Sequence, residues 1–352
     1  KMDRRNEDHS LNQKHMDLAA SIQKVIEIIV LKIAKKAFDL TKCDNLCLAG
    51  GVALNCVANS KILEEKIFKN IWIQPASGDA GGSIGAALYG YYNNFNKKRV
   101  IQKTDSMNGS FLGPKYTNNE IKRTLDKLRI RYEFINTDKI FNKTIKLIIQ
   151  GKTVGWFQGR MEFGPRALGH RSIIGDPRSK KMQKIMNLKI KFRESFRPFA
   201  PSILEEDSKE WFNISCKSPY MLFVAQLNQS KRVNLKPGQK NLKGLRLLYV
   251  NRSVIPAVTH VDYTARLQTV NKKYNTEFYK LIKKFKQLTK CPLLINTSFN
   301  VRGEPIVCSP KDAIECFMST NLDALVIENY FILKQEQDKK LKSIYVREFE
   351  LV

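Results

Sequence analysis

The sequence lacks the features that mark several common protein classes. It has seven cysteines, an odd number, and no two of them form a CxxC pair. This pattern argues against a disulfide framework and against a structural zinc site, and it predicts reduced, buried and inert thiols. There is no run of 18 uncharged apolar residues, and the opening KMDRRNEDHS does not resemble a signal peptide. The sequence therefore predicts a cytoplasmic protein with no membrane partner.

Acidic residues are scarce beside basic ones. The chain has 33 Asp and Glu residues against 61 Lys and Arg residues, a net charge of +28. This balance excludes an acidic solvating protein and indicates attraction to anions such as phosphates, nucleic acid or acidic glycans. A lysine-biased proteome would produce the same excess. Aromatic residues do not alternate with a basic stripe as a single-strand-binding groove requires, so a nucleic-acid partner is not expected.

The residues that are present predict two α/β domains. The 352 residues are 43% hydrophobic, enough for a substantial core. A long helix is predicted over 15–38. Strands are predicted at 46–49 and 71–73, and each leads through glycines into a helix. The first of these two helices ends near residue 65, and the second spans 83–92. A polar, basic stretch at 93–108 predicts a domain junction, which gives domains of 1–100 and 101–352. Beyond it we expect helices at 118–128, at 138–150 and from 310, strands at 153–157, 292–295 and 325–333, and an exposed loop at 227–248.

Two glycine-rich loops suit a nucleotide. Gly50 and Gly51 stand between a strand and a helix, where the backbone can approach a ligand and the helix amides can bind an anion. Asn55 follows, either to contact a base or ribose or to satisfy the backbone. In the second loop, Asp79 is either a helix N-cap or a metal-binding carboxylate beside phosphates.

Two later stretches concentrate arginine among glycine, proline and phenylalanine. They are GRMEFGPRALGHRS at 159–172 and KFRESFRPFAP at 191–201. The alternation in the second stretch predicts an extended segment with its cations on one side and its rings in the core. Arginine forks match phosphate or carboxylate oxygens, whereas the alternative is a solvated basic face.

The last two motifs supply neutral polar groups. They are TARLQTV at 264–270, preceded by His260 and Asp262, and NTSFN at 296–300. Asn and Ser at a strand end can bind a small amide or a phosphate oxygen. A Ser-His-acid triad has little support, because no histidine follows Ser298 and the nearest is His260. These residues by themselves point to a transferase that uses a nucleotide and a phosphorylated donor, or to a regulatory anion-binding module.

Six motif strings in this order resemble one family over residues 15–333. GGVALN, QPASGDAGGSIGAAL, GRMEFGPRALGHRSI, KFRESFRPFAP, TARLQTV and NTSFNVRGEPIV are similar to those of the O-carbamoyltransferases of antibiotic biosynthesis and nodulation-factor decoration. The resemblance implies an α/β fold in which the C-terminal half of an actin/Hsp70-like ATPase-superfamily domain precedes a YrdC-like domain. It also implies that carbamoyl phosphate loses phosphate to give carbamate, which ATP converts to carbamoyl adenylate. The carbamoyl group then passes to a hydroxyl of a small-molecule or glycan acceptor, at a site assisted by Fe²⁺ or Mg²⁺.

The resemblance also assigns roles to individual residues. Carbamoyl phosphate and nucleotide phosphates would be bound by Arg166, Lys191, Arg197 and Arg266, with Asn296 and Ser298 at the carbamoyl or phosphate end. The second choices for this site are Arg160, Arg171, Arg193 and Asn300. Gly50, Gly51 and Asn55 would line the nucleotide in the first domain, and Asp79 would bind the metal.

The chain departs from the family at its N-terminal end. Family members begin with a further half of the ATPase-like domain, which carries a pair of metal-binding histidines that this sequence lacks. That half is expected on a separate partner chain, or the sequence is a fragment or a degenerate member. Two other functions stay open: a tRNA threonylcarbamoyladenosine-type modification enzyme, and a non-catalytic subunit of a split carbamoyltransferase.

Overall fold

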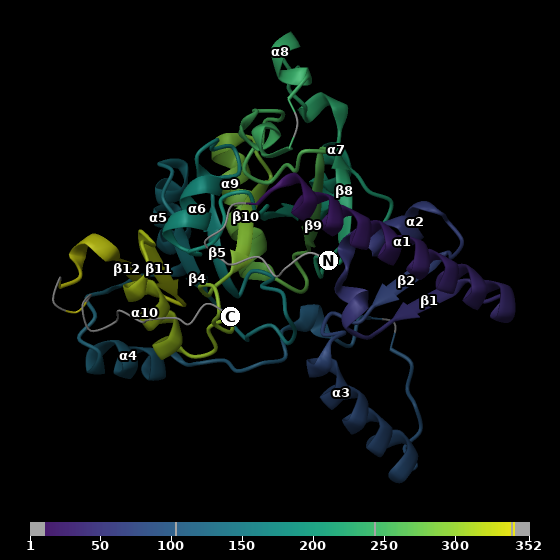
Figure 1. Ribbon diagram of the computed structural model, residues 1–352. Coiled ribbons are helices and arrows are strands. Elements are labelled where there is room, and N and C mark those ends of the chain that lie inside the picture. The colour runs from purple at the N-terminus through teal and green to yellow at the C-terminus, as the bar shows by residue number, and fades with distance from the viewer. Residues whose placement is uncertain (1–10, 103, 243, 339–340, 342–352) are drawn as a thin grey trace.

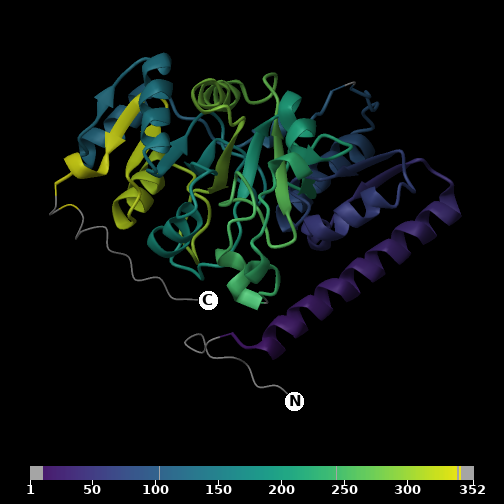
Figure 2. The same cartoon turned by 90° about the horizontal axis from the view of Figure 1, so that it is seen from above.

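A computed structural model describes residues 11–102, 104–242, 244–338 and 341. The first element is the long helix α1 (Gln13–Thr41), which confirms the helix predicted over 15–38. Asn12 caps it, accepting a hydrogen bond from the amide of His15, while the His15 ring accepts one from the amide of Asn12. This helix lies along the outer edge of the molecule (Figures 1 and 2).

The first part of the chain builds a small two-stranded parallel sheet. Its elements are β1 (Asn45–Leu48), η1 (Gly51–Leu54), α2 (Cys56–Glu64), β2 (Asn70–Ile73) and α3 (Asp79–Tyr89). The single helix predicted after Gly51 is wrong, because Asn55 is extended and starts the new helix α2 as its N-cap. The second helix begins at Asp79 rather than at residue 83, and a π-helical turn, η2 (Gly90–Asn94), follows it.

The rest of the chain builds a ten-stranded mixed sheet in the order β3-β12-β11-β4-β5-β10-β6-β9-β8-β7. Its strands are β3 (Glu133–Phe134), β4 (Val154–Phe157), β5 (Arg171–Gly175), β6 (Ala200–Leu204), β7 (Phe212–Asn213), β8 (Phe223–Leu227), β9 (Thr264–Val270), β10 (Leu293–Ser298), β11 (Ala324–Ile327) and β12 (Tyr330–Leu333). Its helices are η3 (Asn108–Ser110), α4 (Asn118–Lys127), α5 (Thr137–Ile149), α6 (Met182–Lys189), η4 (Glu205–Asp207), α7 (Ser208–Trp211), η5 (Gln229–Lys231), α8 (Pro237–Lys240), η6 (Gly244–Tyr249), α9 (Thr276–Thr289), α10 (Pro310–Ser319) and η7 (Lys334–Glu336). The α/β class is thereby confirmed.

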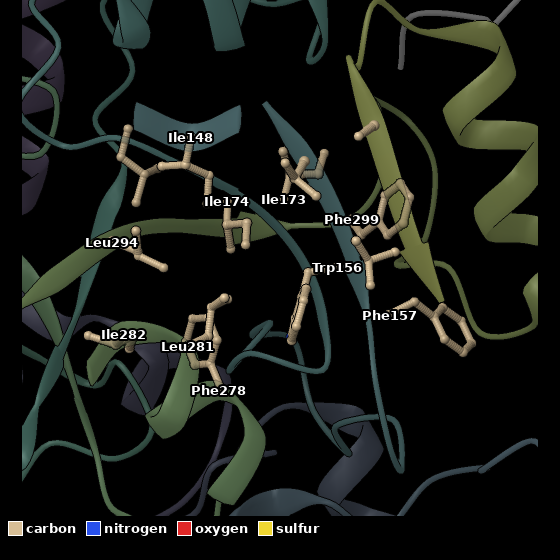
Figure 3. Packing of buried hydrophobic residues seen from close by; sticks show 14 of the residues in the cluster. Ile148, Trp156, Phe157, Ile173, Ile174, Phe278, Leu281, Ile282, Leu294 and Phe299 are labelled. Atoms are coloured by element: carbon tan, nitrogen blue, oxygen red, sulfur yellow. The ribbon is translucent and has the colours of Figure 1, made fainter. Parts of the chain in front are cut away.

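Helices cover the centre of this sheet. Every residue of β4, β5 and β6 is buried, as strands with both faces covered require. Helix α9 contacts β6 and β10, α5 contacts β4, and α10 contacts β4 and β11. In Figure 3, Trp156 and Phe157 of β4 lie among Ile173 and Phe299. The core therefore fixes the ends of β5, β9 and β10, where the motif residues stand.

Three other details differ from the sequence predictions. The single strand expected over 325–333 is the antiparallel pair β11 and β12. The stretch after Lys191 is irregular rather than extended. Lys191 is buried and Phe192 is exposed with a φ of 46°, against the predicted placement of cations and rings, whereas the exposed Arg197 and the buried Phe199 follow that prediction. All seven cysteines are free, but only Cys291 and Cys316 are buried, so the prediction of buried thiols fails for the other five.

Two helices leave apolar side chains uncovered. On α1, Ile22 is 53% exposed and Ile33 is 64% exposed. Helix α3 has no buried residue, and it projects from the rest of the molecule (Figure 1). Within the described residues, neither these helices nor any other is both long enough and apolar enough to cross a membrane.

Candidate active site

A cavity of about 500 Å³ lies where the first part of the chain meets the large sheet. Six segments that are distant in sequence line it: the start of α2, the loop before β5, the loop before β6, the start of β8 with the residue Met221 before it, the start of β9 with the loop before it, and the end of β10. Five of the predicted site residues line this cavity: Arg166, Arg197, Arg266, Asn296 and Ser298. Arg193, a second choice, lines it as well. Tertiary structure thus brings most of the predicted donor-site residues into one place.

Three buried polar atoms of this cavity have no hydrogen-bond partner in the structure. They are Nε of Arg166, Nε of Arg266 and Oδ1 of Asn296. The Asn296 amide nitrogen is fully engaged, since it donates to the carbonyl of Ala167 and to the side chains of Ser202 and Gln268. The residues that line the cavity therefore carry two unused donors and one unused acceptor, an arrangement that costs free energy unless another group pairs with them.

Four guanidinium groups make the cavity cationic. Burial, together with the neighbouring Arg166, lowers the pKa of Arg266 to about 10, and burial with the nearby Arg197 lowers the pKa of Arg193 to about 10. Both side chains remain charged at neutral pH, so their mutual repulsion and desolvation favour an anion beside them. Arg197 is half exposed and pairs with Glu194 at 3.1 Å, which offsets part of its charge.

The loop that carries Arg166 is held by a buried carboxylate. One oxygen of Glu162 accepts hydrogen bonds from the amides of Leu168 at 2.7 Å and His170 at 2.8 Å. Gly164 has a φ of 135°, and a Cβ there would stand 3.0 Å from the carbonyl oxygen of Pro75, so the loop and the second glycine motif pack closely. The loop therefore needs this glycine to bring Arg166 to the cavity.

Arg171 and Arg160, two of the second choices, belong to the framework of this loop. Arg171 is fully buried, lies over the ring of Phe157, and donates to the carbonyls of Gln158 at 2.9 Å and Gly159 at 3.2 Å. Arg160 is exposed and donates to the carbonyl of Gly113. Neither residue lines the cavity, so the structure gives Arg171 a structural task.

Lys191 lies behind the cavity wall rather than in it. Its Nζ is 3.2 Å from Ser298 Oγ and 2.7 Å from Asn300 Oδ1, and it also contacts the carbonyl oxygens of both residues. Four oxygen acceptors suit an ammonium group, whereas burial and the charge of Arg193 lower the pKa of Lys191 to about 7. Lys191 thus orients Ser298, and both of its protonation states are populated near neutral pH.

Because Lys191 is buried, we expect the free energy of unfolding to depend on pH, and we expect Lys191→Met to reduce that dependence. An unfolded lysine keeps its proton up to a pKa near 10.5, whereas the folded one loses it near 7. Between these values the unfolded state binds more protons, so the free energy of unfolding should rise with pH, by at most about 1.4 kcal/mol per pH unit. Urea denaturation at pH 6.5 and 9 should show a rise in the wild type that is smaller in Lys191→Met. An equal rise in both proteins would contradict the lowered pKa assigned to Lys191. Lys283→Met, at an exposed position, is the control and should behave as the wild type does.

The motif reasoning named His260 and Asp262 but gave them no role in the site, and both line the cavity. His260 Nδ1 is 3.1 Å from Asp262 Oδ1, which also accepts from the amide and hydroxyl of Thr264. Partial burial opposes ionisation of Asp262, but these hydrogen bonds hold its pKa below the usual range. Their position just before the TARLQTV motif was the sequence signal that could have assigned them to the site.

The predicted nucleotide residues of the first part lie beside the cavity. Asn55 caps α2 through the amide of Ala58 at 3.1 Å and pairs with the side chain of Gln23. Gly50 has a φ of 94° and stands in open space with Gly51. Arg166 reaches the carbonyl of Leu54 at 3.4 Å, so this turn adjoins the arginines. The nucleotide role of Gly50, Gly51 and Asn55 remains a prediction.

The described residues do not form a complete metal site. Asp79 is exposed and is the first residue of α3, whose N-cap is Gly78. Across the described residues, no group of three or more His, Cys, Asp and Glu side chains is placed to hold a metal ion. A single exposed carboxylate does not meet the ligand number that Fe²⁺ or Mg²⁺ requires.

Comparisons with known proteins identify two matching family models. Residues 145–334 match the carbamoyltransferase C-terminus, and residues 3–88 match the carbamoyltransferase N-terminus. The matches therefore cover most of the chain on both sides of the predicted junction.

Several relatives align with almost the whole chain. An uncharacterized protein of Synechocystis, sll1178, is 52% identical over 99% of this chain and 57% of its own length. Nodulation protein NolNO of Sinorhizobium fredii is 39% identical over 92% of this chain and 45% of its own. Nodulation protein NolO of Bradyrhizobium diazoefficiens is 38% identical over 92% of this chain and 55% of its own. The chain thus spans about half the length of these relatives.

Proposed function

The chain belongs to the carbamoyltransferase family, and from this premise we propose that its arginine-lined cavity binds carbamoyl phosphate for an O-carbamoyltransferase. The observation that carries the proposal is the set of three unpartnered atoms on residues that line the cavity: Nε of Arg166, Nε of Arg266 and Oδ1 of Asn296. Family membership favours this function over tRNA modification.

Carbamoyl phosphate is complementary to these three atoms. Its phosphate oxygens accept hydrogen bonds and carry negative charge, which suits the two arginine donors. Its amide nitrogen is a donor, which suits Oδ1 of Asn296. Inorganic phosphate satisfies only the arginines. We therefore expect the cavity to bind carbamoyl phosphate more tightly than inorganic phosphate.

The proposed reaction has three balanced steps. Carbamoyl phosphate and one water give carbamate and phosphate. A carbamate oxygen then attacks the α-phosphorus of ATP, and the bond to the β-phosphate oxygen breaks, which gives carbamoyl adenylate and pyrophosphate. The acceptor hydroxyl finally attacks the carbonyl carbon and loses its proton, and AMP leaves.

Pre-placed cations are what the first two steps need. Both gather phosphate charge in one place, and fixed positive groups stabilise that charge without reorganising. Arg166, Arg193 and Arg266 would supply this charge, with Arg197 at the exposed side. Ser298, held by Lys191, would contact a phosphate or carbamoyl oxygen. We assign no step to a metal held by this chain.

The acceptor side of the proposal extends beyond the described residues. We propose that residues 1–100 are the C-terminal part of an ATPase-like domain and that residues 101–352 form the YrdC-like donor domain. The exposed apolar side chains of α1 and the uncovered α3 would pack against the remaining half, in the same or a separate chain. The acceptor would be a hydroxyl of a small molecule or glycan.

Binding of carbamoyl phosphate and of acetyl phosphate tests this proposal. The two compounds differ by an amino group in place of a methyl, so only the first can donate to Asn296 Oδ1. Titration calorimetry should give about tenfold or greater preference for carbamoyl phosphate, since leaving a buried acceptor unpaired costs about 1–3 kcal/mol. Asn296→Ala should lose this preference, whereas Asn296→Asp, which keeps an acceptor, should retain part of it.

Inorganic phosphate is the second control ligand in this experiment. It should bind the wild type and Asn296→Ala with similar affinity, because it needs only the arginines. Equal binding of all three ligands to the wild type would mean that the cavity is a generic anion site, and the proposed function would be wrong.

A further inference from the structure

The arginine-lined cavity also contains a histidine and a carboxylate that share one tight turn before β9. The amide of His260 donates to the carbonyl of Thr264 at 2.9 Å, and the amide of Tyr263 donates to the carbonyl of His260 at 3.0 Å. Tyr263 is in the left-handed region with a φ of 65°, and its carbonyl accepts from the amide of Leu227, the last residue of β8. Two neighbouring strands therefore fix the turn that carries His260 and Asp262.

Asp262 determines which nitrogen of the His260 ring carries a proton. Its Oδ1 accepts from the amide of Thr264 at 2.9 Å and from the hydroxyl of the same residue at 2.7 Å. Partial burial opposes ionisation of this carboxyl group, but its hydrogen bonds to His260 and Thr264 hold its pKa below the usual range. Because Asp262 is a carboxylate, Nδ1 of His260 is the donor in their 3.1 Å contact, and Nε2 of the neutral ring keeps a lone pair.

Nε2 of His260 has no hydrogen-bond partner within the part of the chain that the structure describes. The side chain lines the cavity and is 42% exposed, so the ring is accessible to water. Thr264, which Asp262 also holds, and Arg266 stand two positions apart on β9 and therefore share one face of that strand. The histidine is thus anchored beside the strand whose arginine we propose to bind the phosphate.

The other groups at the cavity are poorer bases than His260. Arginine keeps its proton at neutral pH, asparagine, serine and threonine do not accept one there, and the Asp262 carboxylate already accepts three hydrogen bonds. Cys56 lines the cavity, but no described side chain accepts a hydrogen bond from its thiol. Lys191 lies behind the wall, where its Nζ contacts four oxygen atoms. Among the residues that line the cavity, His260 is therefore the one base that a carboxylate orients, as general-base catalysis requires.

We propose that His260 is the general base of the first proposed step, in which it takes a proton from the water that attacks carbamoyl phosphate, and that Asp262 is its positioning residue. The inference rests on the proposed function. The water oxygen bonds to the carbonyl carbon while one of its protons passes to Nε2 of His260. The bond from that carbon to the phosphate oxygen then breaks, and phosphate leaves with the electron pair. The proton on Nε2 passes to the phosphate, and the carbamic acid that remains ionises to carbamate.

Phosphate release from carbamoyl phosphate by the full chain tests this role. With ATP present and the enzyme-free rate subtracted, ³¹P NMR should show a rate that is lower by about 100-fold or more in His260→Ala. Calorimetry should show carbamoyl phosphate binding within about twofold of the wild type, because the base acts on the water rather than on the ligand. Added imidazole should restore part of the lost rate, since it can occupy the space of the missing ring.

Two further variants separate a catalytic role from a structural one. Asp262→Asn removes the carboxylate that orients the ring, and it should lower the rate by about tenfold, less than loss of the base itself. Imidazole should not rescue this variant, because His260 is still present. His15→Ala is the matched control: His15 lies in the first turn of α1, outside the residues that line the cavity. It should release phosphate as the wild type does and should not respond to imidazole.

The outcomes distinguish this inference from the proposed function. An unchanged rate in His260→Ala, no response of that variant to imidazole, or a loss of binding as large as the loss of rate would each show that His260 is not the base. A wild type that binds carbamoyl phosphate but releases no phosphate above the enzyme-free rate would also overturn the inference, while the donor site would stand. Failure of the wild type to bind carbamoyl phosphate overturns the proposed function, and this inference with it.

Discussion

Arg266→Met is expected to weaken carbamoyl phosphate binding by about 100-fold, or about 2.7 kcal/mol. Arg266 stands on β9, and its buried Nε has no partner within the protein. A ligand phosphate would therefore pair with a desolvated charge, and truncating such a pair costs roughly 2–5 kcal/mol. Methionine keeps most of the length of the aliphatic stem of arginine, so the change removes the guanidinium without opening a large void. Titration calorimetry measures the loss.

Two other arginine variants calibrate this result. Arg197→Ala should cost less, about tenfold, because Arg197 is half exposed and already pairs with Glu194. Arg123→Ala, at an exposed position of α4, should change nothing. If Arg266→Met and Arg123→Ala bind carbamoyl phosphate equally well, Arg266 does not hold the donor and the site assignment is wrong.

Arg171→Met is expected to lower the free energy of unfolding by about 3 kcal/mol or more. Its guanidinium is fully buried and donates to the carbonyls of Gln158, Gly159 and His170. Methionine leaves these acceptors without their charged donor, and each hydrogen bond to a charged group contributes about 1.5–3 kcal/mol. Burial lowers the pKa of Arg171 to about 10, so the donor is still charged at pH 7.

The measurement is urea denaturation at pH 7, with Arg123→Met as the surface control. A loss below about 1 kcal/mol would contradict the structural role of Arg171. Arg171→Lys distinguishes charge from geometry: lysine keeps the charge but cannot reproduce the fork that reaches several carbonyls. It should therefore recover only part of the lost stability.

Two arginines that the sequence presents alike have different places in the structure. Arg166 and Arg171 stand five positions apart in one glycine- and proline-rich motif, and both carry the same fork. The structure directs Arg166 into the cavity and Arg171 under the loop, against Phe157. Nothing in the local pattern distinguishes them, because the loop's path depends on Glu162 and on the packing of Gly164 against Pro75.

The sequence determined the elements whose signals are local. Helical spacing of apolar residues located α1, α4 and α5, and short apolar runs located β1, β2 and β4. The ordered motifs also indicated the carbamoyltransferase family and five of the residues that line the cavity. These signals survive folding because they depend on the residue itself or on neighbours within a few positions.

Only the tertiary structure decided how these elements meet. It placed Lys191 behind Ser298, made the turn at Asn55 a helix cap, and brought His260 and Asp262 to the arginine-lined cavity. Each outcome depends on contacts between segments far apart in the chain, such as Lys191 and Ser298, whose positions differ by 107. The cost of burying a charge or leaving an acceptor unpaired is set by those contacts, so it becomes visible only once the chain has folded.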